Sequence, residues 1–364
     1  MKKLLIAFGT RPEIIKLAPV ILELRDSYEL KLLHTGQHRE IADPMLSLFG
    51  ISPDVDLEIM KTNQDLFSLT SNLLPKLSKV LDEYQPEHVM VQGDTSTSFL
   101  TALAAFYKRI PVSHVEAGLR SYDKYSPFPE EMNRRQISQI AQLHFAPTSI
   151  NRNALVKEGI SKEKIFVTGN TVIDALNMII GSDDFSKSSP SILSEIEKDE
   201  KLILLTAHRR ENHGAPLIQI FKAVEELLAT QPDLKVIFPI HPNPNVKAAL
   251  DKSGLNNTRM IQTHPMEYLP FLHVLKRADL ILTDSGGIQE EATVLGKPVL
   301  ILRNETERRE LIEAGLGEIV GTDISKIVSR SKALLESTIN HSTSNIFGDG
   351  KAAEKIHEIL KDQL

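Results

Sequence analysis

The chain has 364 residues, 41% of them hydrophobic and 25% charged, which is typical of a globular protein large enough for two domains. The 42 Lys and Arg against 48 Asp and Glu give a net charge of −6, which argues against a protein that holds nucleic acid by neutralising phosphates. There is no cysteine. Disulfides and thiolate metal ligands are therefore excluded, and we expect a cytoplasmic protein of a reducing compartment.

The apolar run 4–8 is too short for a signal peptide and predicts a first strand, and no segment is long enough to span a membrane. Short apolar runs then alternate with helical patterns such as 95–107 and 130–141. The expected strands are 3–8, 30–34, 88–92, 112–115, 143–146 and 165–167 in the first half and 202–206, 235–240, 259–262, 279–283 and 298–302 in the second. This alternation predicts parallel α/β sheets.

The small polar residues of 181–191 interrupt the alternation and predict a connection between two domains. We expect Rossmann-like, doubly wound domains at 1–180 and 199–350 that face a cleft. A last helical pattern, 352–364, is compatible with packing on either domain, and we assign 351–364 to the first. Open α/β sheets bind ligands at the carboxyl ends of their strands, so the polar residues there are the candidate site.

The strand that ends at Thr283 is followed by Ser285, Gly286 and Gly287 and then by a helical pattern. A helix that begins at a glycine turn directs unpaired N–H groups at whatever lies above the strand, which favours a phosphate. Glu291, in the first turns of that helix, can accept hydrogen bonds from ligand hydroxyls. A phosphate and a diol together indicate a nucleotide, and the alternative is a plain strand-to-helix turn with solvated glutamates.

Charged residues also follow the strands of the first half. Arg11 lies in the turn after the first strand and Lys16 lies one turn into the next helix, where both can reach an anion or can simply be surface charge. Asp94 follows the strand 88–92, and the alternative is that Asp94 and Thr95 simply cap a helix, the common role of an aspartate before a helical run. Glu116 follows an apolar strand at a glycine-containing turn, where no cap is needed, so we interpret it as a functional carboxylate.

Two further groups follow these. Glu130 belongs to an acid pair behind two prolines, and one carboxylate of the pair suits a helix N-terminus. His208 lies at a strand end beside two arginines, which makes an anion site as good an interpretation as a structural histidine. No spacing of histidines and carboxylates is that of a metal site, so we expect no metal.

Taken together, these residues resemble the non-hydrolysing UDP-N-acetylglucosamine 2-epimerases, which have the two-domain glycosyltransferase-B fold. The resemblance spans nearly the whole chain. The motifs are FGTRPE (8–13), TGQHRE (35–40), GDT (93–95), HVEAGLR (114–120), YSPFPEE (125–131), VTGNTVIDAL (167–176), AHRREN (207–212), EYLPF (267–271), DSGGIQEE (284–291), LGKPVL (295–300) and GDG (348–350).

The resemblance implies the roles of individual residues. The implied catalytic group is Asp94, Glu116, Glu130 and His208. The implied UDP contacts are Arg11, Lys16, Ser285, Gly286, Gly287, Glu291 and Arg308, with Phe271 beside the uracil. The implied partners are UDP-N-acetylglucosamine, UDP-N-acetylmannosamine and UDP, in a homodimer, with neither nucleic acid nor membrane.

Two departures from the family pattern stand out. Arg309 replaces the usual proline after Arg308. Gln37, His38 and Gln64 match a second, regulatory site for UDP-N-acetylglucosamine, but Asn63 and Pro44 replace its usual Arg and Gln. We therefore expect weak or absent activation by substrate.

The implied reaction is epimerisation at C2. No carbonyl acidifies the C2 proton, so UDP is expelled from C1 to give 2-acetamidoglucal and then returns after protonation of the opposite face. This scheme needs acid or base groups on both faces of the ring, donors for the diphosphate and no cofactor. A glycosyltransferase of the same fold and a noncatalytic UDP-sugar sensor remain as alternatives, although a sensor would not need all three carboxylates.

Overall fold

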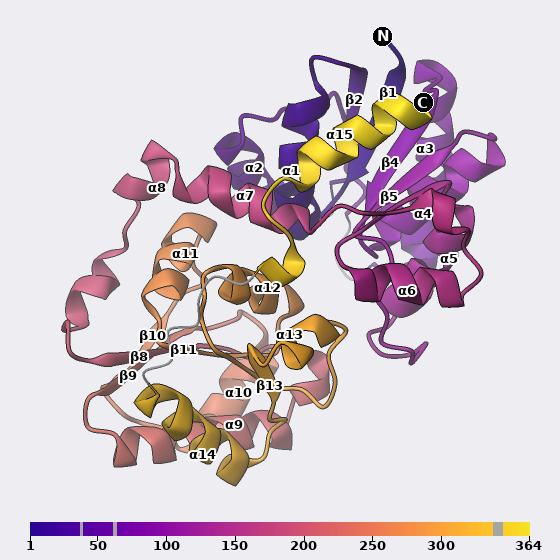
Figure 1. The fold of residues 1–364 in the computed structure, drawn as a ribbon. Helices are drawn as coiled ribbons and strands as arrows, with labels where there is room; N and C mark the ends of the chain where they lie inside the picture. Colours follow the sequence, from indigo (N-terminus) through magenta and orange to yellow (C-terminus); the bar gives the residue numbers. More distant parts are fainter. Residues whose placement is uncertain (37–38, 61–63, 338–344) are drawn as a thin grey trace. The chain divides into compact units, whose positions relative to one another are not determined.

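A computed structural model of the chain describes residues 1–364 except 37–38, 61–63 and 338–344 (Figure 1). Its contacts define two compact units, Met1–Met178 with Phe347–Leu364, and Ile179–Ile346. The polar stretch 181–191 lies within the second unit and holds helix α8 (Asp183–Lys187). The chain returns to the first unit at Phe347.

The first unit is built on a parallel sheet with the strand order β3-β2-β1-β4-β5-β6-β7. Its strands are β1 (Lys3–Phe8), β2 (Glu29–His34), β3 (Val55–Asp56), β4 (His88–Gln92), β5 (Val112–Val115), β6 (Leu143–Ala146) and β7 (Ile165–Val167). Its helices are α1 (Arg11–Leu24), α2 (Arg39–Leu48), α3 (Leu66–Tyr84), α4 (Ser96–Tyr107), α5 (Glu130–Ile140), α6 (Ser149–Lys157), α7 (Thr171–Ile180) and α15 (Ala352–Gln363).

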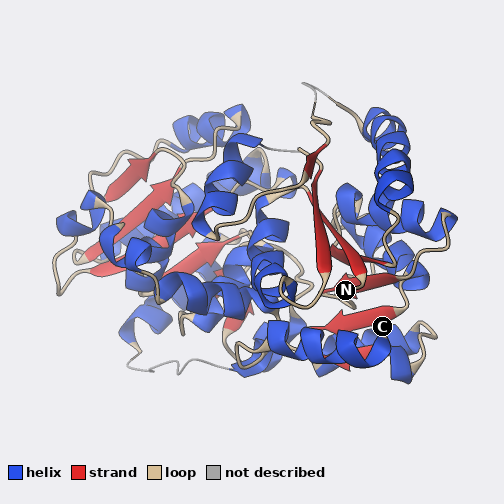
Figure 2. Ribbon diagram, turned by 90° about the horizontal axis from the view of Figure 1, so that it is seen from above, coloured by secondary structure: helices blue, strands red, loops and turns tan. Residues whose placement is uncertain are grey.

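The second unit repeats this plan with the order β10-β9-β8-β11-β12-β13. Its strands are β8 (Lys201–Thr206), β9 (Leu234–Pro239), β10 (Met260–Thr263), β11 (Leu280–Thr283), β12 (Val299–Ile301) and β13 (Gly317–Ile319). Its longer helices are α9 (Ala215–Thr230), α10 (Pro244–Ser253), α11 (Tyr268–Arg277), α12 (Gly286–Val294) and α14 (Ile324–Glu336), and α13 (Arg309–Glu313) is a short one. Helices flank the strands of each sheet in Figure 2.

These two sheets confirm the predicted α/β class. Each expected strand is present with ends within one residue of the prediction, and the helices predicted over 95–107 and 130–141 are α4 and α5. The sequence analysis missed β3 and β13, which are the outer strands of their sheets. They have two and three residues and no apolar run, so they carry no strand signal of their own.

The central strands are almost wholly buried because helices cover the sheets, which explains why apolar residues follow one another in them without alternation. Helix α15 packs on α1, as Figure 1 shows (yellow beside indigo). A close approach of two glycines allows this return: a Cβ on Gly348 would lie 2.9 Å from the Cα of Gly169. Within the described residues, none of the helices has the length and apolar character needed to cross a membrane.

Strand order reverses between β1 and β4 in the first sheet and between β8 and β11 in the second. In doubly wound sheets such a reversal opens a crevice at the carboxyl ends of the strands, where ligands bind. The turns after β1, β4, β5, β8 and β11 carry many of the predicted site residues, so each unit is described at these turns.

Candidate functional site

The turn after β1 is tied to the turn after β4 by one buried carboxylate, Glu13. It accepts hydrogen bonds from the backbone N–H groups of Gly9 (3.1 Å) and Thr10 (2.8 Å). It also accepts from the hydroxyls of Thr95 (2.6 Å) and Ser98 (2.9 Å), at the start of α4. Burial raises the pKa of Glu13, and these hydrogen bonds oppose that shift. The exposed Arg11 begins α1 on this fixed turn.

Glu116 follows β5 and is buried in an unusual backbone conformation. Its φ of 66° lies in the left-handed region, which a residue with a side chain rarely adopts and which often marks a functional position. The carboxylate accepts hydrogen bonds from Lys16 Nζ and from the amide of Gln92, both of them buried. Lys16, expected at UDP, therefore contacts Glu116 in this structure.

The turn after β4 is fixed by a buried histidine of β5, His114. The Nε2 of His114 lies 2.7 Å from the carbonyl oxygen of Gly93. Burial lowers the pKa of His114 to about 3, so the ring is neutral at physiological pH, and the carbonyl requires that Nε2 carry the proton. Gly93 has a φ of 71°, a left-handed backbone conformation that suits glycine, and Asp94 is the next residue in this turn.

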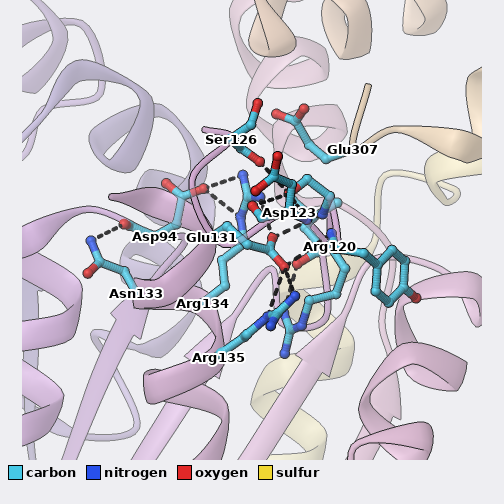
Figure 3. A network of polar contacts seen from close by, with 12 residues as sticks. Asp94, Arg120, Asp123, Ser126, Glu131, Asn133, Arg134, Arg135 and Glu307 are labelled. Carbon is cyan, nitrogen blue, oxygen red and sulfur yellow. Dashed lines mark hydrogen bonds and ion pairs between the residues drawn. The ribbon is translucent and has the colours of Figure 1, made fainter. Parts of the chain in front are cut away.

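Asp94 does not cap α4. Thr95 is the N-cap residue, and its hydroxyl accepts from the N–H of Ser98 (3.1 Å). The side chain of Asp94 instead pairs with the buried Arg134 of α5 (2.6 Å), as Figure 3 shows. The cap interpretation is therefore confirmed for Thr95 and wrong for Asp94, whose carboxylate is held beside the turn.

The structure separates the acid pair at the start of α5. Glu131 is fully buried and accepts from Arg134 (3.3 Å), Arg135 (3.0 Å) and the backbone N–H of Ser121 (3.0 Å). Glu130, the first residue of the helix, is half-buried. Glu131 is thus the structural member of the pair.

In the second unit, His208 follows β8 and is held by Asp284, the residue after β11. The Nδ1 of His208 lies 3.5 Å from Asp284 Oδ1. The other oxygen, Oδ2, accepts from the backbone N–H groups of His208 (2.8 Å) and Arg209 (2.9 Å) and from the amide of Asn212 (3.0 Å). The ring of His241 stacks on that of His208, with centroids 4.9 Å apart. Asp284 therefore fixes the backbone of the turn that carries His208.

Helix α12 begins at Gly286 with Ser285 as its N-cap residue, as the Ser-Gly-Gly sequence predicts. A Cβ on Gly286 would lie 2.4 Å from a guanidinium nitrogen of Arg308, whereas a Cβ on Gly287 would meet nothing within 4 Å. Gly286 therefore makes room for an arginine side chain, and Gly287 leaves the first turn of the helix open.

Arg308 is held at this helix end by two buried carboxylates. Its Nε donates to Glu290 (2.8 Å) and its Nη1 to Glu307. Thr306 in the same loop donates to the side chain of Gln289 (2.9 Å). The loop is thus anchored to α12, and Arg309, where the family pattern leads us to expect a proline, is the first residue of α13.

The remaining predicted UDP contacts lie on α11 and α12. The hydroxyl of Tyr268 donates to the buried Glu291 (2.9 Å), which fixes that carboxylate. Phe271 is half-buried one turn further along α11. Of the residues predicted for a regulatory site, Gln64 is described, whereas Gln37 and His38, together with Asn63, lie outside the described residues.

The structure reveals supporting residues that the sequence analysis missed. They are Glu13, Gln92, Arg134, Tyr268, Asp284, Glu290 and Glu307. Only Glu13 had a recognisable signal, because Thr10 and Glu13 have the spacing of a capping box. In the described ranges, no group of three or more histidines and carboxylates is arranged to hold a metal ion.

A sequence model of the UDP-N-acetylglucosamine 2-epimerase family matches residues 21–361. The epimerase of Escherichia coli O157:H7 is 45% identical, over 99% of this chain and 98% of its own. The crystal structure of the Neisseria meningitidis epimerase bound to UDP-GlcNAc has a TM-score of 0.93 and 44% identity, and covers 99% of this chain and 100% of that one. The Methanocaldococcus jannaschii epimerase, in complex with UDP-GlcNAc and UDP, has a TM-score of 0.85 and 36% identity, covering 99% of both chains.

The fold is also shared more widely. A glycosyltransferase of kitacinnamycin covers 98% of both chains with a TM-score of 0.64 at 10% identity, a likeness of fold alone. The epimerases, in contrast, are more than 30% identical to this chain over nearly its full length, so they share its sequence as well as its fold. This chain belongs to the UDP-N-acetylglucosamine 2-epimerase family.

Proposed function

We propose that this protein interconverts UDP-N-acetylglucosamine and UDP-N-acetylmannosamine by expelling UDP from C1 and returning it. Full-length relatives carry the epimerase name, and one of them was crystallised with UDP-GlcNAc. The observation that carries the proposal is Glu116, a buried carboxylate in a left-handed backbone conformation that Lys16 and Gln92 hold in place. A solvated loop residue needs no such support.

In the proposed reaction, a carboxylate removes the C2 proton as the C1–O bond breaks, and the bonding electrons leave with the diphosphate. A C1–C2 double bond forms, and the products are 2-acetamidoglucal and UDP. Protonation of C2 from the other face and return of UDP to C1 give the epimer. No atom is oxidised or reduced, so no redox cofactor is needed.

We assign the proton transfers to Asp94, Glu116 and Glu130. The saturated hydrogen bonding of Glu131 supports the choice of Glu130 from the acid pair. We assign His208 to the diphosphate leaving group, with Asp284 holding its backbone N–H and lying 3.5 Å from its Nδ1.

We assign UDP to the start of α12. Ser285, Gly286 and Gly287 offer the N-terminal N–H groups of the helix, and Arg308 adds a cation beside them. Glu291 is the proposed acceptor for ribose hydroxyls and Phe271 the proposed neighbour of the uracil. Arg11 is a further proposed diphosphate ligand. The resemblance also implies that Lys16 binds the diphosphate, and this stays a prediction because Lys16 contacts Glu116 in this structure. We also expect a homodimer, which light scattering would test.

Incubation of the pure protein with UDP-N-acetylglucosamine in D2O, without an acceptor, tests the proposal by NMR at C2. We expect the manno sugar to accumulate with deuterium at C2. Epimerisation without deuterium would contradict the elimination scheme. Turnover that needs an acceptor would identify a glycosyltransferase, and binding without any turnover would identify a sensor.

A further inference from the structure

The N-terminal part of helix α5 contacts two loops of the first unit: the loop at Ser121 and Tyr122, and the turn after β4 that carries Asp94. The fully buried Glu131 accepts from the backbone N–H groups of Ser121 (3.0 Å) and Tyr122 (3.3 Å), and from the guanidinium groups of Arg134 and Arg135. A carboxylate that satisfies donors from both the helix and the preceding loop fixes the start of the helix against that loop.

Arg134 extends this network to the turn after β4 (Figure 3). Its Nε and Nη2 lie 2.8 Å and 2.6 Å from the same oxygen of Asp94, Oδ2, while its Nη1 lies 3.3 Å from Glu131. The neighbouring Asn133 donates its side-chain amide to the backbone carbonyl of Asp94 (2.8 Å). Asp94 is therefore held from α5 by both its side chain and its backbone.

The two partners differ in exposure. The side chain of Asp94 is 25% exposed and that of Arg134 only 5%. Arg134 is thus placed behind the carboxylate, and because both of its bonds go to Oδ2, the other carboxylate oxygen is left for another partner. Without this contact, an aspartate at a strand end has several rotamers available.

We infer that Arg134 is a positioning residue that holds the Asp94 carboxylate in its reactive orientation, and that Glu131 in turn holds Arg134. This inference rests on the proposed function, in which Asp94 takes part in proton transfer at C2. A planar guanidinium held on two sides orients a carboxylate more strictly than a flexible ammonium does.

The test compares Arg134→Ala with Arg135→Ala, a matched variant on the same helix whose guanidinium also contacts Glu131. We expect Arg134→Ala to lower kcat about 10- to 100-fold, the usual cost of misplacing a reacting group, with little change in KM. Added guanidinium ion should restore part of the lost kcat. Arg135→Ala should retain kcat, and equal losses in the two variants would overturn the inference.

A double-mutant comparison separates this inference from the proposed function. In the Asp94→Asn background, Arg134→Ala should cost no further kcat if Arg134 acts through Asp94. An additive loss would overturn the inference, whereas full kcat in Asp94→Asn alone would overturn the proposed role of Asp94. If Arg134→Ala does not fold, Arg134→Lys replaces it, and a wild-type kcat in that folded variant would contradict strict orientation by the guanidinium.

Discussion

In the first unit, carboxylates at the strand ends are held by buried cations, whereas in the second unit a cation at a helix end is held by buried carboxylates. Lys16 contacts Glu116 and Arg134 contacts Asp94. In the second unit, Glu290 and Glu307 contact Arg308. The two Rossmann-like units share a strand order, but the paired carboxylates of the first follow strands, whereas the paired cation of the second lies at the start of a helix.

This inversion has a physical basis. A buried charge without a partner costs several kcal/mol, so each working group needs a counter-ion behind it. Carboxylates suit the proton transfers that we assign to the first unit. A cation suits the diphosphate, for which we propose Arg308 of the second unit together with Arg11 of the first. The proposed proton-transfer residues and the proposed UDP contacts of α12 can therefore be tested separately, by substitutions in one unit at a time.

The largest effects are expected from the carboxylates of the first unit. Asp94→Asn, Glu116→Gln and Glu130→Gln should each lower kcat by about 10²- to 10⁴-fold, because each removes a proposed acid or base. UDP affinity should change little, as measured by calorimetry. Loss of UDP affinity with unchanged kcat in all three variants would contradict the division between the units.

Substitution of the neighbouring Glu131 should lower the stability of the protein, whereas substitution of Glu130 should not. Glu131→Gln removes the buried charge that the buried Arg134 and the half-buried Arg135 both contact, which we expect to lower the free energy of unfolding by about 3 kcal/mol. Glu130→Gln should keep wild-type stability. Denaturant unfolding of both variants measures the difference, and equal stabilities would show that the pair was assigned wrongly.

The strands of the first unit should also lose stability in acid sooner than those of the second. Burial lowers the pKa of His88 and His144 to about 4 and that of His114 to about 3. Unfolded histidines titrate near 6.5, so below that pH the unfolded chain binds more protons than the folded unit. Each histidine should then remove about 1.4 kcal/mol per pH unit until its folded pKa is reached.

Hydrogen exchange of peptides from β4, β5 and β6 against peptides from β8 and β9 measures this difference between about pH 7 and about pH 5. The raised pKa of Glu13 acts with the opposite sign, because protonation of that carboxyl in the folded state stabilises the unit towards low pH. His88→Gln should flatten the pH dependence, and the exposed His264 provides the control, His264→Gln. Equal slopes in these two variants would contradict the prediction.

The two glycines of α12 offer a matched pair in the second unit. Gly286→Ala should displace Arg308 and lower both the melting temperature and UDP affinity, the latter about tenfold through one charge-assisted contact. Gly287→Ala should leave the unliganded protein as stable as wild type or up to about 1 kcal/mol more stable, since its Cβ meets open space. A loss of UDP affinity in Gly287→Ala would then locate a ligand at this open turn.

The smallest effect concerns regulation. Asn63 and Pro44 stand where the family pattern leads us to expect the Arg and Gln of a regulatory site, so we expect a nearly hyperbolic velocity curve and a reverse reaction that needs no added UDP-N-acetylglucosamine. A missing guanidinium removes about one to two decades of effector affinity. Initial rates from pure UDP-N-acetylmannosamine test this, and a lag abolished by a trace of the gluco sugar would show that the site survives.

Local sequence determined much of the fold. Apolar runs such as 89–91 in β4 predict strands that are covered on both faces, and the Ser285-Gly286-Gly287 turn predicts the start of α12 because a serine N-cap and glycines suit that position. The short edge strands β3 and β13 lacked such a signal, since their pairing depends on a neighbouring strand.

Only the tertiary structure decided which charges meet. Sequence spacing allowed a capping role for Asp94 and did not distinguish Glu130 from Glu131. In the structure, Arg134 lies on a helix packed against α4 and pairs with both Asp94 and Glu131. The contact of Lys16 with Glu116 joins residues 100 positions apart. Such pairs cannot be predicted from local patterns, because the energy that selects a partner arises only when folding removes both charges from water.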